Sequence, residues 1–291
     1  MNNLKNIILG HNSFFGINHF DNEIGRKKLI TEFNNSEKIS KIINFSFENN
    51  LRNFMISTVD ETKSLIPKIN ESKKIKDELG LFILLPYINK YVRKTNELGI
   101  LGVMKDVLSQ QNIIDKVKIS FDLMKFLSNI DYKEIIPTLI KFEMSSFKKS
   151  LIKSVILHDS LTDILVSLGR FDIILFYYEY VSKNYSCTPG FATKNLSSFL
   201  NLVKNKNIDD IYILTHVNKI GYEMNPNQSI VEEEIKKTKM NIICMSILAS
   251  GYLNPAEALT YIKSLNINSN LSTVIGCSTE KHILEYINHT S

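Results

Sequence analysis

The 291-residue sequence has no tryptophan, three cysteines and no long apolar run. None of its apolar stretches approaches the roughly 18 consecutive apolar residues that a membrane helix needs, so we expect no membrane partner. The first ten residues lack the basic, apolar and small-residue zones of a signal peptide. Cys187, Cys244 and Cys277 form no CxxC or Cys/His spacing, which is typical of reduced cytosolic thiols. We therefore expect a cytoplasmic protein whose mature chain starts at Met1.

A strong charge of one sign is also missing. The formal net charge is +5, and lysines alternate with acids, as in residues 232–237, rather than forming a basic stripe. This pattern is typical of solvated helix faces and argues against nucleic acid as a partner. We expect a small-molecule substrate, and nothing in the sequence indicates an oligomeric state.

The sequence does contain a regular alternation of short apolar runs with longer amphipathic segments, the pattern of a parallel sheet crossed by helices. A chain of this length forms one large domain by default. We predict a single α/β domain over residues 1–291, with the fold of a (β/α)8 TIM barrel. The predicted strands are residues 6–9, 54–57, 81–85, 155–157, 173–176, 211–214, 242–245 and 273–275.

The clearest predicted helices cover residues 160–168, 193–203, 229–237, 255–264 and 280–287. A residue that can cap the first turn stands at or next to each start. These caps are Ser160, Thr193, Ser229, Asn254 and Ser278. The middle is less regular: a long helical region is expected around residues 98–127, and within residues 131–150 the run 135–140 fits a strand or a helix. The place of the fourth strand therefore stays open.

Three of the six histidines come directly after predicted strands, namely His11, His158 and His216. In a (β/α)8 barrel the residues just after the strands form the active-site face, so we expect these imidazoles to meet at one mouth. Imidazole acts there as a general acid or base near neutral pH, or as a ligand for a divalent metal. No HxH or HExxH spacing occurs, so the metal interpretation is the alternative.

Further polar residues occupy the same strand ends. Asp159 follows His158 directly and would orient its ring, and Asp60 would complete either an acid–base or a metal arrangement. We predict four catalytic residues, His11, His158, Asp159 and His216. We predict four substrate-binding residues, Asn12, Asp60, Tyr87 and Asn218.

Two loops have special compositions. Residues 187–196 place glycine and proline before a helix start, where backbone amides and the helix dipole could hold an anion with Lys194 adding charge. Ordinary turn chemistry explains this loop equally well. Residues 215–226 form a polar loop with an aromatic residue, Tyr222, and are long enough to cover a ligand.

The last quarter of the chain carries the most specific pattern. Residues 241–255 read Asn-Ile-Ile-Cys-Met-Ser-Ile-Leu-Ala-Ser-Gly-Tyr-Leu-Asn-Pro, and residues 273–281 read Thr-Val-Ile-Gly-Cys-Ser-Thr-Glu-Lys. This part of the sequence resembles the end of aldo-keto reductases, in which a strand ending in Ser-Pro-Leu-Ala-x-Gly is followed by a helix and by an Ile-x-Gly-x-Ser turn. In that family these two loops hold the nicotinamide dinucleotide. The resemblance implies that NADP or NAD lies along Ser246, Leu248 and Ser250, with its phosphates near Gly276, Ser278, Thr279 and Lys281.

The family's catalytic tetrad does not carry over. Ile56 stands where the family has its aspartate, no tyrosine follows at the expected short distance, and Leu84 or Leu85 replaces the strand-three lysine. Because no histidine lies between His19 and His158, we expect the strand-four histidine to be absent as well. Possible substitutes are Lys90, Tyr87, His11 and His158.

We therefore expect an aldo-keto-reductase-like barrel enzyme, an NAD(P)-dependent oxidoreductase with a non-standard catalytic set. His158, supported by Asp159, would donate the proton, and His11 or His216 would polarise a substrate positioned by two asparagines, Asn12 and Asn218. One alternative is a metal-dependent hydrolase or lyase that uses the three histidines with Asp60 or Asp159 around a divalent ion. Another alternative is a non-catalytic ligand-binding barrel.

Overall fold

Eight parallel strands pair in chain order and close into a barrel in this computed structural model, which describes residues 7–14, 36–86, 132–265 and 271–290. The barrel closes where β8 pairs with β1, from Ile7 opposite Thr273 to Gly10 opposite Gly276. The predicted (β/α)8 fold is confirmed. The strands are β1 (Ile7–Gly10), β2 (Asn53–Ser57), β3 (Gly80–Leu85), β4 (Ile152–Leu157), β5 (Thr188–Ala192), β6 (Tyr212–His216), β7 (Asn241–Met245) and β8 (Leu271–Gly276).

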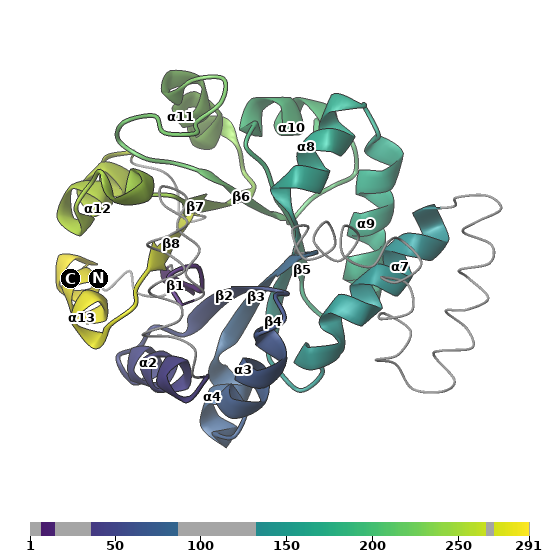
Figure 1. Cartoon of the computed structure of the whole chain (residues 1–291). Coiled ribbons are helices and arrows are strands. Elements are labelled where there is room, and N and C mark those ends of the chain that lie inside the picture. The colour runs from purple at the N-terminus through teal and green to yellow at the C-terminus, as the bar shows by residue number, and fades with distance from the viewer. Residues whose placement is uncertain (1–6, 15–35, 87–131, 266–270, 291) are drawn as a thin grey trace, which may run out of the picture.

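The helices form a ring outside the strands (Figure 1). Each amphipathic helix turns its apolar stripe toward the barrel, as α2 does with Ile39, Ile43 and Phe47. None of the helices in the described ranges is long and apolar enough to cross a membrane. The helices are α2 (Ser36–Glu48), α3 (Thr62–Ile69), α4 (Lys73–Glu78), α7 (Tyr132–Glu143), α8 (Asp159–Ser167), α9 (Phe171–Asn184), α10 (Leu196–Val203), α11 (Gln228–Lys237), α12 (Pro255–Ser264) and α13 (Glu280–Thr290), with 3₁₀ turns at η3 (Met144–Phe147) and η4 (Ala249–Gly251).

Two apolar clusters stabilise this arrangement. The larger one fills the layer between the strands and the helices, and the smaller one fills the barrel interior. Side chains alternate across a strand, so every strand can serve both clusters. The buried interior residues are Ile8, Met55, Phe82, Ile156, Ala192, Leu214 and Ile243, one from each of the first seven strands. The interior is thus a packed core, and ligand chemistry is left to the strand ends.

The prediction of the fifth strand was wrong. Residues 173–176 belong to α9, whose buried residues Ile174, Tyr177 and Val181 recur at helical spacing. Periodicity alone cannot distinguish a short segment of a buried helix from a buried strand, because the sequence of each is a continuous apolar run. The true β5 contains Pro189 and Gly190, residue types that disfavour strands in sequence patterns.

Other local predictions also need correction. Residues 135–140 are part of a helix, α7, and the helical region expected at residues 98–127 lies outside the described residues. The cap of α12 is Asn254, as predicted, whereas His158, Asn195 and Asn227 cap α8, α10 and α11 in place of the predicted serines and threonine. At α13, Thr279 Oγ1 accepts the hydrogen bond from the amide of His282.

Gly190 allows β5 to pack closely against β4. A Cβ atom at this position would lie 2.7 Å from Ile156 Cγ1 and 3.0 Å from Ser154 Oγ. We predict that Gly190→Ala lowers the free energy of unfolding by roughly 1–3 kcal/mol, because overpacking forces neighbouring side chains to shift. Urea denaturation measures this change. Gly276→Ala is the control, since a Cβ there meets nothing within 4 Å, and equal unfolding midpoints for the two variants would contradict the prediction.

Candidate active site at the barrel mouth

The buried imidazole of His216 joins the ends of two neighbouring strands. His216 is the last residue of β6 and lies opposite Met245 of β7. Its Nδ1 atom is 3.0 Å from Oγ of Ser246, the residue that follows β7. On the other side of the ring, Nε2 lies 3.3 Å from Oε2 of Glu223, a contact that lacks hydrogen-bond geometry and becomes an ion pair when the ring is protonated. The side chain of His216 is 7% exposed, so the ring is held between a hydroxyl and a carboxylate.

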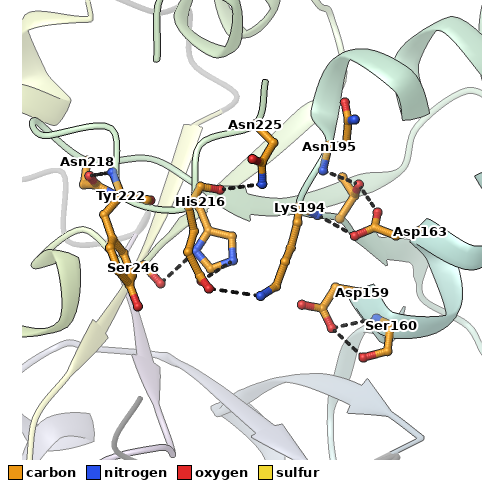
Figure 2. A network of polar contacts seen from close by, with 12 residues as sticks. Asp159, Ser160, Asp163, Lys194, Asn195, His216, Asn218, Tyr222, Asn225 and Ser246 are labelled. Carbon is orange, nitrogen blue, oxygen red and sulfur yellow. Dashed lines mark hydrogen bonds and ion pairs between the residues drawn. The ribbon is translucent and has the colours of Figure 1, made fainter. Parts of the chain in front are cut away.

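Lys194 extends this network toward β4 (Figure 2). Its Nζ atom lies 3.1 Å from Oε1 of Glu223, so the two oxygens of that carboxylate contact different partners. Burial alone would lower the pKa of Lys194, but the hydrogen bond and charge of Glu223 and the charges of Asp159 and Asp163 raise it. A lysine ammonium therefore stands among three carboxylates at the mouth.

His158 and Asp159 form a second imidazole–carboxylate pair. Nδ1 of His158 lies 2.6 Å from Oδ1 of Asp159, and the amide of Ser160 donates to the same carboxylate oxygen at 2.7 Å. The amide also lies 3.3 Å from Nδ1, but the shorter bond to the carboxylate dominates. Burial would raise the pKa of Asp159, yet the hydrogen bond and charge of His158 lower it to about 2. Asp159 is therefore a carboxylate at neutral pH.

His158 follows the fourth strand, which corrects the expectation that a strand-four histidine is absent. The barrel order makes Ile152–Leu157 the fourth strand, and His158 comes directly after it. The sequence prediction failed because the fourth strand was sought between residues 87 and 155. By contrast, Ile56 at the tetrad's aspartate position is buried, and at the lysine position Leu85 is buried and Leu84 is partly buried.

The proposed anion site at the start of α10 is filled by the protein's own carboxylate. The Thr193 hydroxyl and the Lys194 amide donate to Asp163 of α8, at 2.5 Å and 3.0 Å. Burial raises the pKa of Asp163, and these hydrogen bonds oppose the shift. The side chain of Asn195 accepts a bond from the amide of Ser198 and so caps the helix itself. This loop therefore holds α8 against β5.

Like His216, and unlike the partly exposed His158, His11 is almost completely buried. It is 4% exposed, and burial lowers its pKa to about 4, against a hydrogen bond with the backbone of Met55 that would raise it. His11 is therefore neutral at neutral pH. The next residue, Asn12, is exposed, and Asp60 after β2 is partly buried.

Asn218 has a structural role in its loop, and substrate binding by this residue stays a prediction. Its amide group donates to the carbonyl of Tyr222 at 2.8 Å and accepts from the amide of Tyr222 at 2.7 Å. These bonds shape the loop that presents Glu223. Tyr87 and Lys90 lie outside the described residues. Within the described ranges, no group of three His, Cys, Asp or Glu side chains could hold a metal ion, so the metal alternative gains no support.

The predicted cofactor residues lie on the loops after two adjacent strands, β7 and β8. Ser246 and Ser250 have backbone φ angles of 55° and 58°, a left-handed conformation that is uncommon for residues with a side chain. Leu248 is partly buried between them. Gly276, at the end of β8, is exposed, as are Thr279 and Lys281 after it, and Ser278 is partly exposed. The adjacent Cys277 carbonyl accepts a bond of 2.8 Å from Ser13 Oγ, which ties this turn to the loop after β1.

Solved structures of other proteins have the same fold as this chain. No family model and no curated protein matches the sequence. A Pseudomonas aeruginosa protein provisionally described as an aldo-keto reductase superposes with a TM-score of 0.62 at 9% identity, over 98% of this chain and 89% of that chain. An aldo-keto reductase from a Medee basin deep-sea metagenome library gives 0.53 at 9% identity, over 86% and 79%. A variant of Gox0644 in complex with NADPH gives 0.53 at 8% identity, over 98% and 83%. This chain therefore has the (β/α)8 fold that aldo-keto reductases have.

The site also contains residues that sequence reasoning missed. Glu223 and Asp163 were not predicted, and Lys194 was assigned to an anion-binding helix start. The signal for Lys194 was its position after a strand, which Pro189 and Gly190 obscured. No local pattern places Glu223, because its approach to His216 depends on the folding of the whole loop after β6.

The buried neutral His11 predicts a specific pH dependence of stability. Between about pH 6.5 and pH 4 the unfolded chain binds a proton at His11 that the folded chain does not, so stability falls as the pH is lowered. The loss reaches about 3 kcal/mol by pH 4. We predict that His11→Gln reduces the pH dependence of the unfolding free energy in this window, as measured by urea titrations. His289→Gln, at an exposed position, should keep the wild-type slope, and an unchanged slope in His11→Gln would refute the prediction.

Proposed function

We propose that this protein is an NAD(P)-dependent oxidoreductase of the aldo-keto reductase type in which His158 replaces the family's tyrosine as proton donor. The observation that carries the proposal is the pairing of His158 with Asp159, at 2.6 Å, directly after the fourth strand. The same strand end carries the family's histidine. The pair therefore supports acid–base chemistry at the end of the fourth strand, on the face of the barrel where active sites lie.

The carboxylate of Asp159 would fix the proton on Nδ1 of His158 and hold the ring in one orientation. In the doubly protonated ring, Nε2–H would then deliver its proton to a substrate carbonyl oxygen, which leaves the neutral ring with its proton on Nδ1. Lys194, whose charge also acts on Asp159, would keep that carboxylate ionised during the reaction. His216 is better suited than His11 to polarise the substrate, because its ring lies beside Ser246 and Glu223 at the strand ends, whereas the low pKa of His11 keeps that ring neutral.

The loops after β7 and β8 are suited to a dinucleotide. Gly276 has open space where a side chain would stand, which permits close approach of a phosphate group. Thr279 and Lys281 add an exposed hydroxyl and an ammonium group near the start of α13, and Ser246 and Ser250 line the neighbouring loop. A bound nicotinamide dinucleotide would supply a hydride. The residues of this chain would hold it and provide the proton.

Binding is the first experiment. Native mass spectrometry of the purified chain with added NADPH or NADH should detect one dinucleotide per chain, and Lys281→Ala should weaken the binding if phosphate contact is made near α13. Lys263→Ala is the control, because Lys263 Nζ donates to the carbonyl of His289 at 2.8 Å, at the opposite end of α13 from the proposed phosphate contact. The absence of binding for both dinucleotides would remove the oxidoreductase proposal. Binding without turnover of any aldehyde or ketone would favour a non-catalytic ligand-binding barrel.

We further predict that His158→Gln lowers kcat for NADPH-dependent reduction of 4-nitrobenzaldehyde by about 100-fold or more, since a positioned general acid contributes that much. The Kd for NADPH should stay within the error of the wild-type value, because His158 lies at β4 and the proposed dinucleotide residues lie after β7 and β8. His289→Gln is the matched control at an exposed histidine. An unchanged kcat in His158→Gln would exclude this residue as the proton donor.

A further inference from the structure

Ser246, His216 and Glu223 form a continuous chain of contacts at the ends of β6 and β7. The distances are 3.0 Å from Ser246 Oγ to His216 Nδ1 and 3.3 Å from His216 Nε2 to Glu223 Oε2. A hydroxyl within hydrogen-bond reach of an imidazole is the pairing of an activated serine nucleophile, and the carboxylate on the far side of the ring stands where a small rotation would complete the hydrogen bond of a triad. The three residues come from separate loops and strands, so local sequence preference does not bring them together.

The backbone at both ends of this chain of contacts is unusual. Ser246 and Glu223 each have a φ angle of 55°, in the left-handed region that residues with a Cβ atom adopt at a cost of roughly 1–2 kcal/mol. Strained serines on sharp turns after a strand present their hydroxyl at the mouth of a sheet in other acyl-transfer sites. Ser246 occupies such a turn, in which the amide of Ala249 donates to the Ser246 carbonyl at 2.8 Å.

The carboxylate of Glu223 is held in place by its surroundings. Lys194 Nζ contacts its other oxygen at 3.1 Å, which leaves Oε2 directed at His216. The preceding residue, Tyr222, is fixed by two hydrogen bonds to Asn218. Gln228 donates to the carbonyl of Lys219 at 3.2 Å and anchors the same loop to α11. The carboxylate of Glu223 is therefore positioned by Lys194, and its backbone is positioned by the hydrogen bonds of the loop.

We propose that Ser246 is the nucleophile of an ester-hydrolysing site, with His216 as general base and Glu223 as the group that orients and stabilises it. The Ser246 Oγ atom bonds to the ester carbonyl carbon while its proton passes to His216, and the carbonyl π electrons move onto oxygen. When the carbonyl re-forms, the ester C–O bond breaks and the leaving alkoxide takes the proton from His216 as an alcohol. A water molecule, deprotonated by His216, then releases the carboxylic acid and returns the proton to Ser246.

The turn after Ser246 offers donors for the oxyanion. Within the described part of the chain, its backbone hydrogen bonds are donated by Ala249, Gly251, Tyr252 and Leu253, and none is donated by Ile247 or Leu248. The amide of the residue after a nucleophilic serine is a recurrent oxyanion donor. These two amides are therefore the candidates at this site.

The charges and apolar groups near the site indicate the class of ester. Carboxylates outnumber the one ammonium group here, with Glu223 and Asp159 against Lys194, and this excess disfavours an acid-bearing acyl group. Ile220 and Tyr252 are 52% and 65% exposed, on the loops that follow β6 and β7, and would contact an apolar acyl or alcohol portion. The expected substrates are esters of small, uncharged acyl groups.

Covalent labelling tests the proposal. The full chain is incubated with an alkyl fluorophosphonate, which reacts with activated serines, and the adduct is located by peptide mass spectrometry. We expect one adduct on Ser246 and hydrolysis of p-nitrophenyl butyrate by the same preparation. Ser246→Ala should abolish both signals, and His216→Gln and Glu223→Gln should slow labelling by on the order of 100-fold and 10-fold. Ser264→Ala, at an exposed serine of α12, should label like the wild type.

Thermal unfolding of every variant separates loss of chemistry from loss of fold. Folded wild-type protein without an adduct on Ser246 would overturn the proposal, and so would a labelling rate that does not change in a folded His216→Gln variant. The proposal goes beyond dinucleotide binding and does not require it. Because NADPH binding is measured separately, the reductase and the ester-hydrolysing proposals can fail independently.

Discussion

Closure of the barrel is the constraint on which the rest of the structure depends. The pairing of β8 with β1 leaves no strand edge, and it brings the ends of all eight parallel strands to the same mouth. Gly10 makes this closure possible, since a Cβ atom there would lie 2.8 Å from Val274 Cγ1. Because the interior is filled by apolar side chains, the polar groups lie at the strand ends, outside the interior. The candidate site is made of these polar groups.

Charge pairing then organises the mouth. Carboxylates alternate with cations or imidazoles from β4 to β7, through His158 with Asp159, Lys194 with Glu223, and Glu223 with His216. Each partly buried carboxylate has a partner that offsets the cost of removing it from water. The network thereby holds two imidazoles in defined positions on different sides of Lys194, at the ends of β4 and β6.

The two imidazoles suit two kinds of chemistry on one scaffold. The end of β4 has an imidazole paired with a carboxylate, while β2 and β3 carry apolar residues at the tetrad's aspartate and lysine positions. The ends of β6 and β7 have a hydroxyl, an imidazole and a carboxylate in contact. Ser246 belongs to this group and also to the loop proposed for the dinucleotide. An ester substrate and a dinucleotide would therefore compete for Ser246. The same barrel positions several chemistries because its strand ends vary independently of its core.

The sequence by itself determined the barrel, most of its strands and the placement of His11, His158 and His216 at strand ends, because buried parallel strands leave continuous apolar runs that end in polar residues. It could not distinguish the buried helix at Ile174 from a strand, and this error hid the position of Lys194. Only the tertiary structure decided that Asp163 fills the expected anion site and that Glu223 reaches His216. Those contacts join residues on different strands and loops, and their geometry depends on loop folding and charge pairing that no local periodicity records.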